Sequence, residues 1–459
     1  MLKSIQPHVA RMLFSQKNVA RRRAKYERKR LRNDQPHRVT VYLRINDPHS
    51  YLLLQVLPEL QKRYQLAYDF RTVLTLQSEM YPAPNLWSLN AFNDCAHLAE
   101  LYADINDGLT FPQQAPKSTQ LQDEQITAQL LHYELQENYL EKALPLFHAY
   151  WNDSARLGSL LNPKVIKNTE CYQHHLCANE ALLKNKGHYL TAMLHYAGEW
   201  YWGFNRLQYL EKRLNELKSS LGMPAAVVFD RSHRYFCNGL SQAQIQSLTK
   251  HQSLTKQETR KLTIEMTYSA RSPYSYLGLI RAQKLAQHYQ FQLEVKPVLP
   301  MLMRRMQVPK RKGHYIIHDV CREAEQYDIP FGFIADPLGK GVENTYALFD
   351  YAQSQGLAIE FLTSAASGAW ADGIRADTDK GLAELVTRAG LDWQAARPHL
   401  QKNDWRSWAQ SNLAELYSND QWGVPCFKFN ELVVFGQDRL DRIEQEIANT
   451  LRNESQTNI

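Results

Sequence analysis

The feature that most constrains the fold of this 459-residue chain is an internal repeat. A stretch that begins at Val39, VTVYLRINDPHSYLLLQVLPELQKRYQLAYDFRTVL, aligns without a gap with one that begins at Ile264, IEMTYSARSPYSYLGLIRAQKLAQHYQFQLEVKPVL, at a constant offset of 225 residues. Each copy starts as a strand, passes a proline suited to the first helical turn (Pro48 or Pro273), and reaches a second strand near residues 66–74 or 291–299. This order predicts, in each copy, two parallel strands joined by a crossover helix.

A second pair of similar segments comes late in each copy. Gly222-Met223-Pro224 precedes the apolar run AAVVF, and Gly423-Val424-Pro425 precedes CFKF. We expect each to continue into a turn, a short strand and a terminal helix. Because this pair is offset by only 201 residues, the first copy is expected to carry 24 extra residues in its helical middle. Helix-like stretches in the two middles include 124–151 and 381–389.

The repeat and the length together predict two related α/β domains. A polar stretch around residues 247–261 is typical of a linker. We therefore expect a basic arm at 1–37, a first domain at 38–246, a linker at 247–260 and a second domain at 261–459.

The net charge of +7 originates in the N-terminal arm. Through Arg38 the chain has 12 Lys or Arg and two acids, whereas the remainder is near −3. The arm is interpreted as a solvated tail or as a surface that contacts RNA or anionic membrane, and no specific DNA binding is expected. The arm has no apolar signal segment, so the cytoplasm is the expected location, with a mitochondrial presequence as the alternative.

Six cysteines form no CxxC pair, as expected for thiols in a reducing compartment. The run CYQHHLC superficially suggests a metal site through Cys171, His174, His175 and Cys177. On a helix, however, Cys177 would lie well round from Cys171, and zinc usually needs a second ligand pair elsewhere. We expect buried thiols and surface histidines here, and no metal site.

Six motifs distinguish the second copy, namely SPYSYLGL from Ser272, RKGHYIIHD from Arg311, IPFG from Ile329, AGLD from Ala389, GVPCF from Gly423 and FGQDRLDRIE from Phe435. Together they resemble the kappa-class glutathione transferases and 2-hydroxychromene-2-carboxylate isomerases, which are thioredoxin-fold relatives of the disulfide oxidoreductase DsbA. The resemblance implies two tandem thioredoxin-like (DsbA-like) domains, each a mixed central sheet with an inserted helical subdomain, and glutathione as the cofactor. The first copy shares only its opening unit and its Gly-Met-Pro.

Ser272 is the candidate catalytic residue. It directly precedes Pro273, so its hydroxyl and the free N–H groups of the helix start would face an anion placed there. The run Ser-Pro-Tyr-Ser cannot form a disulfide, so a reactive sulfur has to come from elsewhere. The resemblance implies that this sulfur belongs to glutathione and that Ser272 stabilises its thiolate. The alternative role of Ser272 is a plain helix cap.

The resemblance also implies five glutathione-binding residues. A cis peptide bond before Pro425 would present the backbone of Val424 to the extended tripeptide. Asp438, in a turn with Gln437, would bind the γ-glutamyl ammonium, and Lys312 would bind a carboxylate. The alternatives are an ordinary turn at Pro425, a helix cap at Asp438 and a solvated side chain at Lys312.

Several residues depart from the family pattern or leave their role open. The usual Asn before the lysine is missing, and Gln307 is the nearest amide. Arg271, Arg304 and Arg305 would favour an anionic substrate such as an aromatic carboxylate, or would form a solvated face. Cys426 is expected to be a packed strand residue rather than a reactive thiol.

The first copy carries Asp47 in place of the serine. A carboxylate would oppose a thiolate, so this copy is not expected to activate glutathione. We interpret GEWYWGFNRLQYLEKRL, from Gly198, as a helix that packs Trp200, Phe204, Leu207 and Leu214 against the second copy. The two domains would then form an intramolecular pseudo-dimer, similar to the kappa-class dimer.

These observations predict a glutathione-dependent isomerase or transferase. Its partners would be glutathione and a small unsaturated electrophile, such as an aromatic carboxylate, that accepts the thiolate. The alternative is a non-catalytic thioredoxin-fold scaffold whose basic arm binds RNA or a membrane surface. A thiol-disulfide oxidoreductase is disfavoured because CxxC is missing.

Overall fold

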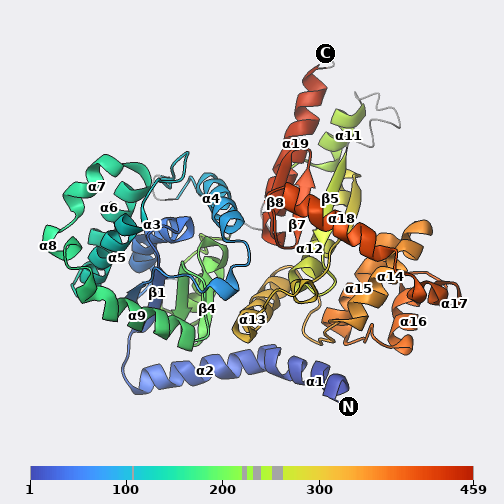
Figure 1. The fold of residues 1–459 in the computed structure, drawn as a ribbon, viewed down its shortest axis with the longest axis horizontal. Coiled ribbons are helices and arrows are strands. Elements are labelled where there is room, and N and C mark those ends of the chain that lie inside the picture. Colours follow the sequence, from blue (N-terminus) through green and yellow to red (C-terminus); the bar gives the residue numbers. More distant parts are fainter. Residues whose placement is uncertain (1, 106–107, 220–224, 231–238, 251–261, 458–459) are drawn as a thin grey trace. The chain divides into compact units, whose positions relative to one another are not determined.

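The computed structural model describes residues 2–105, 108–219, 225–230, 239–250 and 262–457, and the chain divides into two compact units (Figure 1). The N-terminal unit comprises Ala20–Asp230 and Pro309–Tyr315. The C-terminal unit comprises Met1–Val19, Arg231–Val308 and Ile316–Ile459. Each unit therefore includes a short segment that chain order alone would assign to the other.

The sheet of the N-terminal unit has the order β2-β1-β3-β4. Its strands are β1 (His37–Leu43), β2 (Leu66–Thr72), β3 (Met193–Tyr196) and β4 (Glu199–Trp202). β1 runs parallel to β2 and antiparallel to β3, and β3 runs antiparallel to β4. The helices are α2 (Gln16–Arg32, from Ala20 on), α3 (Pro48–Arg63), η1 (Ser78–Met80), α4 (Pro84–Leu101), α5 (Gln120–Glu134), α6 (Tyr139–Asn152), α7 (Ser154–Leu160), α8 (Pro163–Ile166), α9 (Glu170–Asn185), η2 (Phe204–Arg206) and α10 (Leu207–Glu216).

The sheet of the C-terminal unit has the equivalent order β6-β5-β7-β8, with the same strand directions. Its strands are β5 (Thr263–Tyr268), β6 (Gln292–Pro297), β7 (Cys426–Phe429) and β8 (Leu432–Phe435). The helices are α1 (Leu2–Phe14), α11 (Gln242–Lys250), α12 (Pro273–Tyr289), η4 (Met301–Arg304), α13 (Lys310–Gln326, from Ile316 on), α14 (Lys340–Ser354), α15 (Ala358–Ser367), η5 (Gly368–Asp372), α16 (Asp379–Arg388), α17 (Trp393–Ala396), η6 (Arg397–Gln401), α18 (Trp405–Ser418), η7 (Gln437–Arg439) and α19 (Leu440–Thr457).

The predicted strand–helix–strand units are confirmed in both copies. β1, α3 and β2 form one unit, and β5, α12 and β6 form the other, each with a parallel strand pair. The helix predicted at 381–389 is α16. The stretch predicted at 124–151 is instead split into α5 and α6, and Asn138 between them has a left-handed φ of 64°. The polar neck begins as the end of α11, and residues 251–261 lie outside the described parts.

The second pair of similar segments was matched wrongly in the first copy. Gly222-Met223-Pro224 lies outside the described residues, and residues 225–229 form no strand. The sheet registers place Leu194 opposite Val41 and Phe427 opposite Met266, so β3 and β4 are the counterparts of β7 and β8. The expected insertion of 24 residues therefore does not follow.

The aromatic segment from Gly198 is likewise not one helix. It forms β4, η2 and α10, because the alternating aromatic residues Trp200 and Trp202 suit a paired strand. Phe204, Leu207 and Leu214 belong to the apolar core of their own unit. These three side chains, which were expected to pack against the second copy, thus pack inside the N-terminal unit.

The basic arm is helical rather than a solvated tail. In α1, Phe14 contacts the His318 ring edge-on, with centroids 5.0 Å apart, and Ala10 packs against the C-terminal core. In α2, Arg23 Nε donates to Glu199 Oε1 at 2.9 Å. Across the described segments, no helix has both the length and the apolarity that crossing a membrane requires.

Candidate functional site

Ser272 caps the N-terminus of α12 in the C-terminal unit. Its Oγ accepts a hydrogen bond from the Ser275 N–H at 3.1 Å, and Pro273 occupies the first helical position. Ser275 is fully buried, whereas Ser272 is half-buried. Since a hydroxyl that accepts one bond can still donate its own proton, Ser272 can donate to an anion at the positive end of the helix.

The Val424–Pro425 loop lies against the same helix. The peptide bond between these residues is cis, as predicted. A side chain at Gly278, in the second turn of α12, would place its Cβ 3.3 Å from Pro425 Cγ and 3.0 Å from Phe427 Cζ. The missing side chain of Gly278 is therefore what lets the loop approach α12. Val424 is half-buried.

Gln437 and Asp438 lie in η7, which also packs on α12. The Gln437 side chain is 1% exposed, accepts from Arg281 and donates to Glu323 Oε2 at 2.6 Å. The Asp438 side chain is 16% exposed and lies 3.7 Å from the Arg439 guanidinium. The Asp438 carboxylate is thus partly buried beside a cation, and the Gln437 amide serves a buried network that the sequence analysis missed.

Lys312 belongs to the N-terminal unit, not to the unit that holds Ser272. Its Nζ donates to the Met80 carbonyl at 2.8 Å and lies 5.6 Å from the centre of the Tyr189 ring. Burial lowers the pKa of Lys312 to about 8. The neighbouring Arg311 pairs with Glu79 at 2.7 Å. The structure therefore does not assemble Lys312 with the other predicted site residues in one unit.

The positive charge expected from the guanidinium groups is reduced, because Arg271 pairs with Asp336, a partner that the sequence analysis did not identify. Arg271 Nε and Nη2 each donate to a carboxylate oxygen of Asp336 at 2.8 Å. This bidentate pair neutralises the cation beside Ser272. Arg304 ends η4, and burial lowers the pKa of its guanidinium.

Cys426 is a packed strand residue, as predicted. Its thiol is buried and lies 3.1 Å from the Gly423 carbonyl, to which it donates. Burial raises the pKa of the Cys426 thiol, so it stays protonated. This thiol is not the site's nucleophile at neutral pH.

The CYQHHLC run corrects one expectation, because Cys171 and Cys177 are exposed rather than buried. They lie on α9, whose buried residues are instead Leu176, Asn179 and Leu183. His175 Nε2 is 3.0 Å from Glu134 Oε2. Among the residues that the structure describes, no three His, Cys, Asp or Glu side chains gather as they would around a metal ion.

The corresponding site in the N-terminal unit is closed by its own side chains. Asp47 caps α3, is 3% exposed and accepts from the Ser50 and Thr191 hydroxyls at 2.7 Å each. From the sheet register, Thr191 and Ala192 occupy the positions of Val424 and Pro425. Ala192 has a φ of 54° and is fully buried.

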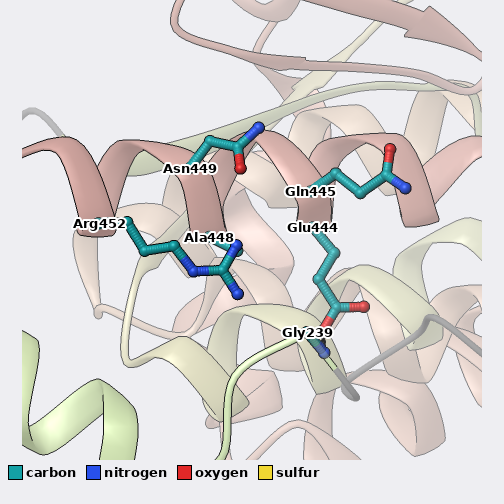
Figure 2. Close-up of a pocket in the computed structure, with 6 residues that line it drawn as sticks. All are labelled: Gly239, Glu444, Gln445, Ala448, Asn449 and Arg452. Carbon is teal, nitrogen blue, oxygen red and sulfur yellow. Dashed lines mark hydrogen bonds between the residues drawn. The ribbon is translucent and has the colours of Figure 1, made fainter.

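A separate hollow in the C-terminal unit lies along α19 (Figure 2). Its lining carboxylate, Glu444, accepts from the Gly239 N–H at 3.1 Å and from the Tyr289 hydroxyl at 2.9 Å. The hollow contains none of the predicted site residues and no nucleophile. The lining residues are Gly239, Glu444, Gln445, Ala448, Asn449 and Arg452.

Comparisons with known proteins concern the C-terminal part. Residues 263–448 match the family model of the DSBA-like thioredoxin domain, so this part has the DsbA-like thioredoxin fold. A 2-hydroxychromene-2-carboxylate isomerase from Sphingobium xenophagum is 27% identical over 192 residues, which are 40% of this chain and 96% of the relative. One from Pseudomonas putida is 23% identical over 199 residues, 42% of this chain and 97% of the relative.

Two solved structures are also similar. A selenomethionine 2-hydroxychromene-2-carboxylate isomerase has a TM-score of 0.38 at 22% identity and covers 42% of this chain and 98% of its own. A probable DsbA oxidoreductase from Streptomyces coelicolor has a TM-score of 0.34 at 16% identity, over 42% of this chain and 90% of its own. The family model confirms the predicted DsbA-like fold for the second copy, and the curated relatives confirm the predicted isomerase relatives. Kappa-class membership and a tandem family arrangement stay predictions.

Proposed function

We propose that the C-terminal unit is a glutathione-dependent isomerase, or a closely related transferase, that acts on an unsaturated carbonyl compound. The observation that carries this proposal is the half-buried Ser272 hydroxyl at the start of α12, in a unit whose relatives are isomerases. No cysteine occupies position 272 or 275, so the helix start offers no redox-active dithiol.

The residues around α12 fit glutathione in part. The hydroxyl of Ser272 suits a sulfur anion, and the partly exposed carboxylate of Asp438, beside Arg439, suits the γ-glutamyl ammonium. The backbone of Val424, beside Pro425, suits an extended peptide paired as a short strand. The amide of Gln437 and the amine of Lys312 already serve internal hydrogen bonds, so the proposal gives them no direct contact.

When bound, glutathione would supply a sulfur nucleophile whose reversible addition to a conjugated double bond allows rotation about that bond before elimination. The Ser272 hydroxyl would donate a hydrogen bond to this sulfur when the sulfur is negatively charged. A charge-assisted hydrogen bond of this kind is worth about 1.5–3 kcal/mol, or one to two pKa units of the bound thiol. The positive end of α12 adds to the same effect. Elimination would give an isomer, and its failure would give a conjugate.

Whether the site accepts an anionic substrate depends on Arg271. An aromatic carboxylate would reach this guanidinium only by displacing Asp336, whose two bonds to Arg271 are 2.8 Å long. We propose an unsaturated carbonyl as the required group and a carboxylate as a further one. The cytoplasm stays the expected location.

Titration calorimetry with glutathione, together with ultraviolet absorbance of the bound thiolate, tests the proposal. We expect wild type to bind glutathione and Ser272→Ala to raise the pKa of the bound thiol by about one to two units, with a 10- to 100-fold loss of isomerisation rate. Ser272→Thr keeps a hydroxyl and a helix cap, so it should restore most of both properties. Ser411→Ala, on the exposed face of α18, is the matched control.

Two outcomes would contradict the proposal. If wild type binds no glutathione, the non-catalytic scaffold is the better interpretation. If Ser272→Ala binds glutathione with an unchanged thiol pKa, Ser272 is only a helix cap.

A further inference from the structure

The N-terminal helices carry exposed side chains that neither unit uses for its fold. In α1, the side chains of Val9, Met12 and Leu13 are 44%, 60% and 44% exposed. Their spacing of three and four residues puts them on one face of the helix. Ala10 and Phe14, on the other face, make the contacts with the C-terminal core. The outer face of α1 is therefore an apolar strip.

The next helix, α2, divides its charges between two faces. Arg23 is bound to Glu199, and Arg30 Nε donates to Glu27 Oε2 at 3.0 Å, so these two cations serve internal ion pairs. Glu27 is the sole acidic residue between positions 16 and 32. Every fully exposed charged side chain of α2 is a cation, and Leu31 and Tyr26 are exposed as well. These cations are Lys17, Arg21, Arg22, Lys25, Arg28, Lys29 and Arg32.

We propose that α1 and α2 bind the surface of an anionic lipid bilayer. Clustered Lys and Arg are attracted to acidic headgroups, and an exposed apolar strip inserts at the boundary between headgroups and acyl chains. The apolar strip belongs to the C-terminal unit and the cationic face, from Ala20 on, to the N-terminal unit, and each would contact lipid in its own right. This surface is independent of the glutathione site.

The apolar strip is what favours lipid over RNA. Phosphate contacts with RNA would use the cations of α2 but would leave Met12 and Leu13 in water. Single-stranded RNA is usually held by aromatic side chains on which bases stack. The described part of the arm exposes one large aromatic side chain, Tyr26, whose ring closely covers Gly198.

Vesicle sedimentation with the full chain tests this inference. The probes are phosphatidylcholine vesicles with and without about 30 mol% phosphatidylserine, at physiological salt. We expect binding to the anionic vesicles alone. The triple variant R22Q/K25Q/K29Q should bind about 100-fold more weakly, since each lost cation near the surface costs roughly five-fold.

Two further variants separate lipid binding from other causes. M12Q/L13Q removes apolar area without changing charge and should weaken vesicle binding about 10-fold. K164Q/K167Q/K184Q removes three exposed cations elsewhere in the N-terminal unit and should change binding less than two-fold. The inference is overturned if wild type ignores anionic vesicles, or if this control binds as weakly as R22Q/K25Q/K29Q. It is also overturned if M12Q/L13Q binds vesicles as wild type does while an RNA oligonucleotide competes for the arm.

Discussion

The two units have equivalent sheets but opposite arrangements at the start of the first helix. In the C-terminal unit a half-buried serine caps α12 with one backbone bond. In the N-terminal unit a buried aspartate caps α3 and also binds the hydroxyls of Ser50 and Thr191. One helix start carries a half-buried hydroxyl, and the other already holds the protein's own carboxylate.

The difference extends to the second turn of the same helix. Gly278 leaves room for Pro425 and Phe427, whereas the position 225 residues earlier holds Leu53, which is fully buried. Leu53 and Ala192 belong to one apolar core, so the larger helix residue accompanies the smaller loop residue. The residue on the helix and the residue on the facing loop therefore differ together between the two units. A single substitution would not convert the packing of one unit into that of the other.

The largest expected effect comes from placing the aspartate in the other unit. Ser272→Asp should lower kcat/KM for glutathione-dependent isomerisation about 1000-fold, because it removes the hydrogen-bond donor and puts a like charge beside the sulfur. Steady-state kinetics with an unsaturated aromatic carboxylate measure this loss. Turnover close to wild type would remove the distinction between the two helix starts.

The reciprocal variant Asp47→Ser is the control. Thr191 and Ala192 remain in place, so calorimetry should show no second glutathione site. A second site would mean that Asp47 alone closes the N-terminal unit.

A second substitution tests the space beside the loop. Gly278→Leu should destabilise the C-terminal unit by about 3 kcal/mol, because the added side chain meets Pro425 and Phe427 in a packed core. Hydrogen exchange of the β7 amides measures this unit separately. Gly158→Leu is the matched control, since a Cβ at Gly158 meets nothing within 4 Å. Equal exchange in both variants would show that the loop does not depend on Gly278.

The smallest expected effect concerns Lys312 in the N-terminal unit. Its pKa is lowered from 10.5 to about 8 by burial, so between these values the unfolded chain binds more protons than the folded one. Stability should therefore rise as pH increases from about 8 to 10.5. Lys312→Met should add about 2 kcal/mol at pH 7 and abolish this rise. Denaturant unfolding across this pH range measures both.

The same variant sharpens the comparison of the units. We expect the Kd for glutathione to change less than three-fold, since the Lys312 amine already donates to Met80. A ten-fold weaker Kd would show that Lys312 serves the C-terminal site, as the resemblance implies.

Sequence reasoning succeeded where the signal is local. The strand–helix–strand units follow from apolar runs and from Pro48 and Pro273 at the helix starts. Ser272 is identified by its place before Pro273, and Pro425 by its motif. Sequence reasoning failed for β3 and β4, because strands of four residues are defined by their pairing, β3 with β1 and β4 with β3. Gly222-Met223-Pro224 also resembled the second copy's motif more closely in sequence.

Two α/β units, the starts of their first helices and the capping residue of each helix could be predicted from the sequence alone. The folded structure was needed to show that Arg271 pairs with Asp336, that Lys312 donates to the Met80 carbonyl, and that Thr191 donates to Asp47. The physical reason is how far apart in the sequence the interacting groups lie. A cap or a helix start depends on neighbours three or four residues away, whereas an ion pair, a lowered pKa or a closed site depends on groups that the folded path brings together.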